Sequence, residues 1–235
     1  MTGRLSDHQR RAIERYEQLL SERPELFGDR QRRPIVSDRR TLSKYAADHD
    51  VVLGVAAETP YMWLINDLVQ SRTAGTSVIH PYLRVIAPPG AADVPGVVVL
   101  ATLNTDGQAE ESVVLVEQER HATGRLELEV PRGFGDPESA ADLHALAELR
   151  QETGYLGDRA ECLGTTVTNS GTSDGSASFY HVRVTGREDA APEAYEAIAA
   201  IRLMPKSELW RRIESGVIRD AFTLQALALY ERRFA

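Results

Sequence analysis

The stretch that decides the fold is EVPRGFGDPESAADLHALAELRQETGY, residues 129–155. Its short apolar start predicts a strand, and the glycine-rich segment that follows predicts a loop. The alanine- and leucine-rich run after the loop predicts a helix. Ser139 with Asp142 three residues later forms a capping box of the Ser/Thr-x-x-acid kind, so we expect the helix over 139–152. Gly154 stands where helices commonly end on a left-handed residue.

Two carboxylates one turn apart, Glu148 and Glu152, are the chemically informative part of this helix. Residues four apart project from one helical face, and two like charges there cost the helix a few tenths of a kcal/mol. A divalent cation between them reverses that penalty, and magnesium prefers oxygen ligands. Glutamate pairs at this spacing are also common on solvated helix surfaces, so the pair alone leaves both interpretations open.

The remaining pattern after residue 77 mixes strands with helices. Strands are predicted at 78–87, 96–103, 112–118, 125–130, 161–168, 176–184 and 198–203. Further helices are predicted at 206–214 and 219–233. This order of elements predicts an α/β fold in which helices flank a mixed β-sheet.

The residues before this region predict a separate N-terminal helix-and-strand extension. Its expected elements are a helix from Ser6 to near Pro24, a short helix from Thr41 to Ala47, and strands at 51–57 and 61–69. The two strands carry apolar surface that needs a cover, either the later domain or a second subunit. We therefore divide the chain into an extension at 1–76 and a main domain at 77–235.

Composition and charge limit the class of protein. The 235 residues are 42% hydrophobic and carry a formal net charge of −8, which is typical of a globular chain and unfavourable for nucleic-acid binding. No apolar run reaches the roughly 20 residues that span a bilayer. The charged N-terminus lacks the apolar core of a secretion signal. Cys162 is the single cysteine, and we expect it in the core. These features favour a cytoplasmic protein without membrane or nucleic-acid partners.

The stretch quoted first resembles the Nudix box, whose pattern is Gly, five residues, Glu, seven residues, then Arg-Glu-aliphatic-x-Glu-Glu-x-Gly-aliphatic. With Gly133 as its first glycine, the chain matches the box at Glu148, Leu149, Glu152, Gly154 and, as the final apolar residue, Tyr155. It departs at three positions, where Ser139 replaces Glu, Ala147 replaces Arg, and Gln151 replaces the first Glu of the pair.

Flanking segments extend this resemblance to the ADP-ribose pyrophosphatase-like group. They are the approach to the box, 116–133, and a segment near the C-terminus, 216–224. The resemblance covers about 78–235 and implies a Nudix-type α/β/α sandwich with a mixed β-sheet.

In Nudix enzymes the helix carboxylates hold magnesium, which bridges a diphosphate and activates water. The resemblance therefore implies metal ligands at Glu148, Glu152, Gln151 and the backbone carbonyl of Arg132, with manganese as the alternative ion. Since Gln151 offers a neutral oxygen where the family has a carboxylate, it should weaken metal binding or reduce the number of ions held.

The same resemblance implies the residues that touch substrate. The implied substrate-binding residues are Arg120, Glu129, Arg132 and Gly133, and the implied catalytic residues are Glu148, Glu152 and Glu196. Glu196, ahead of Glu193, is our candidate general base because it lies in a late acidic loop just before a strand. Glu129 has a second interpretation, as a residue that faces outward along its strand, and His121 is either a proton donor or a solvated or packed neighbour.

Two functions are compatible with these residues. The first is magnesium-dependent hydrolysis of a nucleoside diphosphate linked to another moiety, of the ADP-ribose or nucleotide-sugar type. The alternative is a catalytically weak domain that binds a nucleotide-like ligand or performs altered chemistry. Either way the expected partner is a small nucleoside diphosphate derivative, and analogy with related pyrophosphatases implies a homodimer formed through the N-terminal extension.

Overall fold

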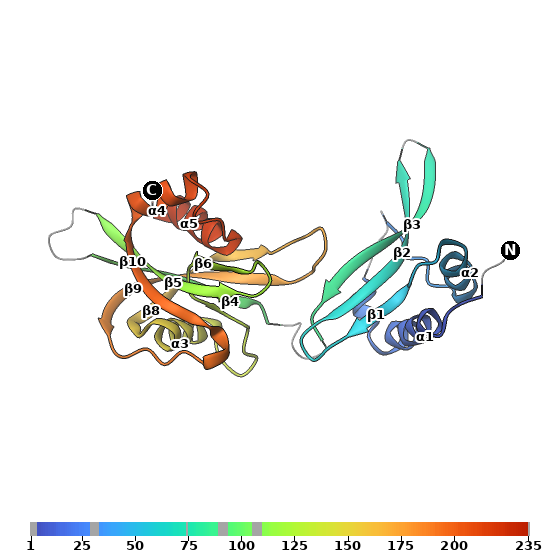
Figure 1. The fold of residues 1–235 in the computed structure, drawn as a ribbon, viewed down its shortest axis with the longest axis horizontal. Coiled ribbons are helices and arrows are strands. Elements are labelled where there is room, and N and C mark those ends of the chain that lie inside the picture. The colour runs from blue at the N-terminus through green and yellow to red at the C-terminus, as the bar shows by residue number, and fades with distance from the viewer. Residues whose placement is uncertain (1–3, 29–32, 74, 89–93, 105–109, 235) are drawn as a thin grey trace. The chain divides into compact units, whose positions relative to one another are not determined.

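A computed structural model describes residues 4–28, 33–73, 75–88, 94–104 and 110–234, and the chain divides into two units (Figure 1). The first unit comprises Met1–Ala92 together with Asn169–Gly175, and the second comprises Asp93–Thr168 and Ser176–Ala235. The boundary expected at residue 76 differs from this division. Strand β3 (Thr76–Ile86) pairs with β2 (Trp63–Thr73) along its whole length, so it belongs to the first unit.

In the described residues of the first unit, an antiparallel sheet has the order β1-β2-β3, where β1 is Gly54–Glu58. Helix α1 (Asp7–Glu22) begins with the predicted capping box, in which Ser6 accepts a hydrogen bond from the N–H of Gln9. Helix α2 (Arg39–His49) begins before Thr41, because the side chain of Asp38 accepts the N–H of Thr41 and acts as the cap.

The apolar face of this sheet is buried by the unit's own helices. Tyr16 and Leu19 of α1 and Leu42 of α2 pack against Ile65 and Leu68 of β2, and all five side chains are buried. The short 3-10 helix η1 (Pro24–Phe27) closes the same core. The cover that the sequence led us to expect from a later domain or a second subunit is therefore supplied locally.

The second unit contains a mixed sheet. Its strands are β4 (Gly96–Asn104), β5 (Glu111–Arg120), β6 (Arg125–Glu129), β7 (Arg132–Gly133), β8 (Tyr155–Val167), β9 (Ser176–Arg187) and β10 (Ile198–Pro205). The main order is β10-β5-β4-β9-β8, with β6 beside β5 and β7 beside β4. The pair β4–β9 is parallel and the other pairs are antiparallel. This confirms the predicted mixed sheet.

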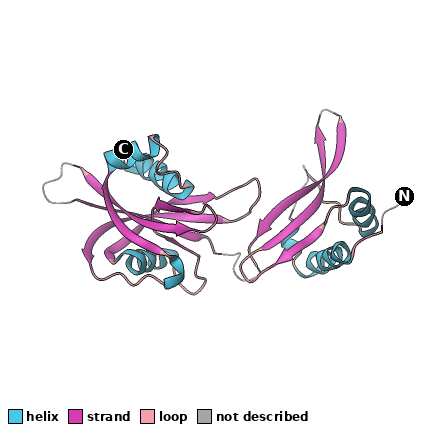
Figure 2. Ribbon diagram, in the orientation of Figure 1, coloured by secondary structure: helices cyan, strands magenta, loops and turns pink. Residues whose placement is uncertain are grey.

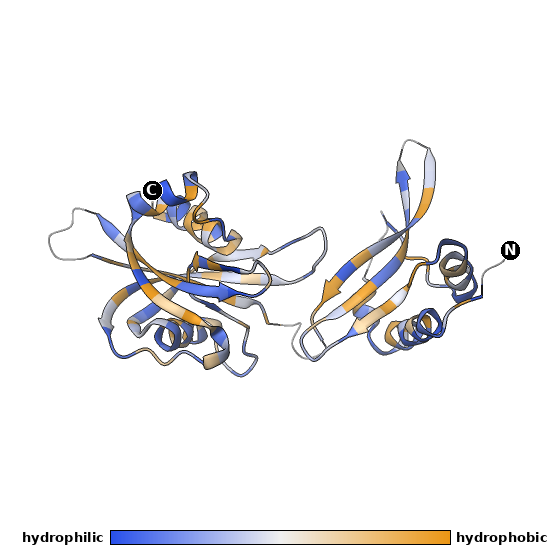
Figure 3. Ribbon diagram, in the orientation of Figure 1, coloured by the Kyte–Doolittle hydropathy of each residue, from blue (hydrophilic) through white to orange (hydrophobic). Residues whose placement is uncertain are grey.

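Helices cover both faces of that sheet, with α3 (Ala141–Thr153) on one side and α4 (Lys206–Glu214) and α5 (Ala221–Phe234) on the other (Figure 2). The alternation of side chains along β4 explains both contacts. Val97 and Val99 pack with Leu149 of α3, whereas Val98 and Leu100 pack with α4 and α5. Strands and inner helix faces carry hydrophobic residues, and the connecting loops are largely hydrophilic (Figure 3). The result is the predicted α/β/α sandwich.

Two local predictions were wrong. Helix α3 has Ala140 as its N-cap residue with no side-chain cap, because Asp136 to Ser139 form a turn in which the Ser139 N–H donates to the Asp136 carbonyl. Cys162 is exposed rather than in the core, since it lies on β8 at the edge of the sheet. No helix within the described ranges combines the length and the apolar character needed to cross a membrane.

Candidate functional site

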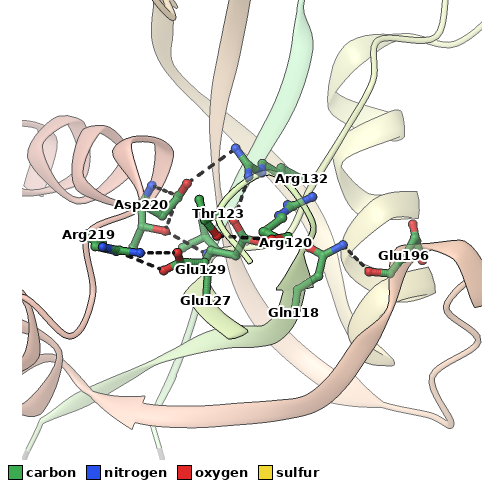
Figure 4. Close-up of polar contacts among 11 residues, drawn as sticks. Gln118, Arg120, Thr123, Glu127, Glu129, Arg132, Glu196, Arg219 and Asp220 are labelled. Carbon is green, nitrogen blue, oxygen red and sulfur yellow. Dashed lines mark hydrogen bonds and ion pairs between the residues drawn. The ribbon is translucent and has the colours of Figure 1, made fainter. Parts of the chain in front are cut away.

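Three carboxylates converge beside the glycine loop. Glu148 and Glu152 come from α3, and Glu196 comes from the 3-10 helix η2 (Ala194–Glu196); one oxygen of each lies within 4.8 Å of the others. Sheet pairing explains how Glu196 reaches α3, because β10 begins directly after η2 and pairs with β5. The side-chain amide of Gln118 on β5 donates to the Glu196 carbonyl (Figure 4). The structure therefore brings the three predicted catalytic residues together.

Glu152 is the most buried member of this acidic cluster, with 3% of its surface exposed. Burial raises the pKa of Glu152 to about 8, the charges of Glu148 and Glu196 add to this rise, and a hydrogen bond from the Arg132 backbone opposes it. Its Oε2 has no hydrogen-bond partner within the described part of the chain. A buried polar oxygen without a partner costs roughly 1–3 kcal/mol, so this atom is suited to a ligand.

Glu148 occupies space that a side chain at position 133 would need. A Cβ added to Gly133 would lie 2.0 Å from Oε1 of Glu148. Burial raises the pKa of Glu148, the charge of His144 lowers it, and Glu196 and Glu193 raise it further. A side chain at position 133 would therefore displace the carboxylate of Glu148, the metal-ligand candidate, from its place beside the loop.

A second network, of arginines around a buried carboxylate, adjoins the acidic cluster (Figure 4). Glu129, 1% exposed, accepts hydrogen bonds from Arg120 (Nε–Oε1, 2.6 Å) and from Arg132 (Nη2–Oε2, 2.8 Å). Burial raises the pKa of Glu129, and the charges of Arg132 and Arg120 oppose that rise. The outward-facing interpretation of Glu129 was wrong, since both of its oxygens hold arginines in place.

The start of α5 reinforces this arginine network. Asp220 lies 3.6 Å from Arg132, and the Arg132 guanidinium stands over the ring of Phe222, 4.3 Å from its centroid. Arg219, the residue before Asp220, forms an ion pair with Glu127 at 2.8 Å. These partners come from segments far apart in the chain, and our sequence analysis missed them. The sequence feature that came nearest to indicating these partners was the C-terminal segment 216–224. Its resemblance to the family did not assign a role to any single residue.

Other predicted residues lie around the cluster. Gln151 is partly buried, and its backbone carbonyl accepts the N–H of Ala191 at 3.0 Å; its metal role stays a prediction. Glu193 is exposed, and its N–H donates to Oε2 of Glu196 at 2.8 Å, so it orients the candidate base. His121 is exposed in the turn after β5, which fits the solvated interpretation.

His144 is a site residue that the sequence analysis missed. Its Nε2 lies 2.6 Å from the carbonyl oxygen of Phe134 and 3.2 Å from Oε1 of Glu148. The signal was present, because His144, Glu148 and Glu152 follow one another at intervals of four along the same helical face.

Comparisons with known proteins agree with this geometry. The chain is 33% identical over 122 residues to an ADP-sugar pyrophosphatase of Mus musculus, covering 49% of this chain and 56% of that protein. It is 30% identical over 159 residues to the chloroplastic Nudix hydrolase 14 of Arabidopsis thaliana, covering 58% of this chain and 49% of that protein. The chain thus spans about half the length of these relatives. No family model matches it.

A solved structure shares the fold. The crystal structure of an ADP compounds hydrolase superposes with a TM-score of 0.59 at 15% identity, over 76% of this chain and 89% of that one. Over about half of its length the chain is therefore similar in sequence to an ADP-sugar pyrophosphatase and to a Nudix hydrolase, and it shares the fold of an ADP compounds hydrolase.

Proposed function

We propose that the second unit hydrolyses the diphosphate bond of a nucleoside diphosphate linked to another moiety, of the ADP-ribose or nucleotide-sugar type, with magnesium as its cofactor. The observation that carries this proposal is the group of three carboxylates that includes Glu152, whose Oε2 has no hydrogen-bond partner among the residues that the structure describes. The names of one sequence relative, the ADP-sugar pyrophosphatase, and of the structural relative, the ADP compounds hydrolase, support a diphosphate substrate that contains ADP.

The residues present fit a hard divalent cation. Carboxylate oxygens are the ligands that magnesium prefers, and Glu148, Glu152 and Glu196 offer them within 4.8 Å of one another. Glu148 and Glu152 would hold magnesium, or manganese in its place, with oxygens of Gln151 and the Arg132 backbone as further candidates. When bound, such an ion neutralises phosphate charge and lowers the pKa of water.

The chain's own residues supply binding and proton transfer. Arg120 and Arg132 would contact phosphate oxygens, a task for which a guanidinium held in one orientation is suited. Glu129 supplies that orientation through its two ion pairs. Glu196 would accept the proton of the attacking water as the new oxygen–phosphorus bond forms. The bond from that phosphorus to the bridging oxygen would break, and the other phosphate would leave with the bridging oxygen.

An activity panel tests this proposal. The full chain is incubated with magnesium and ADP-ribose, an ADP-hexose or a UDP-hexose, and released nucleoside monophosphate is measured by chromatography. We expect release from the ADP compounds, no release after chelation of the metal, and no release from the Glu196→Gln variant. A wild-type protein that leaves every compound intact contradicts the proposed hydrolysis.

Binding without cleavage is the second candidate. It is favoured by one specific observation, the amide of Gln151 where the box has a carboxylate. Calorimetric titration with ADP-ribose separates the two candidates, since a weakly catalytic domain would give a binding isotherm but no monophosphate. The homodimer and the cytoplasmic location stay predictions from the sequence.

Substituting Gly133 with alanine is expected to weaken binding of Mn²⁺, used as the probe, by about 10-fold or more, because the new Cβ would lie 2.0 Å from Oε1 of Glu148 and displace it. The measurement is calorimetric titration. Gly186→Ala is the matched control, since its Cβ would meet Leu156 only at 3.7 Å. Equal affinity in Gly133→Ala and the wild type would show that the carboxylate position is not critical.

A further inference from the structure

His144 holds the glycine loop and the catalytic helix together. It lies in the first turn of α3, with 16% of its side chain exposed, and its Nε2 contacts an atom on each side. One contact is the carbonyl of Phe134, the residue after the box glycine, at 2.6 Å. The other is Oε1 of Glu148, at 3.2 Å. A single nitrogen therefore joins loop, helix and metal-ligand candidate.

The chemistry of these partners assigns the proton. A backbone carbonyl only accepts hydrogen bonds, and so does an ionised carboxylate. The Nε2 atom must therefore carry a hydrogen, which it does in the Nε2–H tautomer of the neutral ring and in the protonated ring alike. The contact works without any change in the charge of His144, so it is a constant part of the site rather than a switch.

Within the described residues, Ser139 and Ala147, two positions where the chain departs from the box, form no side-chain link between the loop and the helix. The Ser139 hydroxyl donates to the neighbouring Ala140 carbonyl, and Ala147 has no polar side-chain atom. The N-cap of α3 also lacks a side-chain hydrogen bond. His144 therefore supplies a connection between the loop and the helix that these residues do not.

We propose that His144 is a positioning residue that fixes the loop carbonyl of Phe134 and the carboxylate of Glu148 through one N–H donor, and thereby sets the affinity of the site for a divalent cation. This rests on the proposed function, because it concerns the same carboxylates. The proposal adds to the site a residue that the box pattern does not specify. Loss of His144 should weaken cation binding by displacing Glu148, because His144 is not proposed to contact the substrate.

The test uses two substitutions that differ in the donor. Glutamine keeps an N–H near the position of Nε2, whereas leucine keeps bulk and removes the donor. Mn²⁺ binding to the full chain is measured from the loss of the free-ion electron paramagnetic resonance signal. We expect His144→Leu to bind Mn²⁺ about 10-fold more weakly than the wild type, and His144→Gln to stay within about threefold. His121→Leu, a change at an exposed histidine, is the matched control and should leave binding unchanged.

A second measurement addresses the loop directly, in protein without metal. Hydrogen–deuterium exchange across residues 134–140 and the first turns of α3 should become faster in His144→Leu and not in His144→Gln. This comparison stays informative when overall stability falls, because exchange elsewhere in the second unit serves as an internal reference.

The outcomes separate the two proposals. If Glu152→Gln binds Mn²⁺ as well as the wild type does, the acidic cluster is not the metal site and both proposals fail. If Glu152→Gln loses binding while His144→Leu retains it, the proposed function stands and the role of His144 is refuted. Equal weakening in the leucine and glutamine variants also refutes it, since the donor would then not be the cause.

Discussion

Replacing Glu152 with glutamine is expected to abolish hydrolysis and, in the same protein, to stabilise the metal-free fold at alkaline pH. Activity should fall by roughly 1,000-fold, about 4 kcal/mol in barrier height, because a neutral amide replaces the most buried carboxylate of the site. Stability should rise because the wild-type protein buries a carboxylate whose Oε2 has no hydrogen-bond partner among the described residues.

The pH dependence follows from the direction of the shift. The pKa of Glu152 is raised from its ordinary value of 4.5 to about 8 in the folded state. The unfolded chain therefore releases this proton at lower pH, and the corresponding stability is full below pH 4.5 and lost as pH rises through about 8. At roughly 1.4 kcal/mol per pKa unit, the loss is on the order of 5 kcal/mol at most.

Thermal unfolding in the presence of a chelator measures this effect at pH 5 and at pH 9. The Glu152→Gln variant should be the more stable protein at pH 9, and the advantage should shrink or vanish at pH 5. Glu138→Gln, an exposed change in the loop before α3, is the control and should show neither effect. A Glu152→Gln protein that unfolds at a lower temperature than the wild type at pH 9 would contradict the argument.

The largest loss of stability is expected in the first unit, from Arg84→Leu. Arg84 and Asp67 form a buried ion pair (Nε–Oδ2, 2.6 Å), and their side chains are 6% and 2% exposed. Arg84 also donates to the Leu26 carbonyl at 2.7 Å, and the hydroxyl of Tyr16 donates to Asp67. Removing the guanidinium leaves a carboxylate in an apolar core, which should cost about 3–5 kcal/mol.

Urea unfolding, followed by a signal from the first unit such as Trp63 fluorescence, measures this cost. The informative control is the double variant Asp67→Leu with Arg84→Leu, since replacing a whole buried ion pair by apolar residues is often close to neutral. It should recover at least half of the loss seen in Arg84→Leu. A single variant that loses less than about 1 kcal/mol would show that the pair contributes little to this core.

The parts of the site that could be predicted from the sequence are those encoded locally. Glu148 and Glu152 were identifiable because four residues separate them on one helix, and Gly154 because a helix end favours a left-handed residue; its φ is 73°. The order of strands and helices was sufficient for the α/β class. Glu196 was predicted from its place in a late acidic loop just before a strand, and the pairing of β10 with β5 brings it to α3.

The parts that escaped prediction depend on distant partners. Arg219 with Glu127, and Arg132 with Asp220, join residues from different elements, and no periodicity within one segment indicates such pairs. The predicted cap of α3 failed for a local reason instead, because a turn ahead of the helix engages the Ser139 N–H with the Asp136 carbonyl. Strand β3 was assigned to the wrong unit since its apolar pattern fits either sheet.

The parallel pairing of β4 with β9 has a consequence for how the protein is made. Residues Val97 to Ala101 of β4 are uncharged, rich in valine and buried on both faces. Their partner residues, from Ser178 to Val182, leave the ribosome long after them. During synthesis the apolar edge of β4 that β9 later covers is therefore unpaired, and such edges favour aggregation. We expect nascent chains halted before β9 to require a chaperone, and completed chains to be released from it.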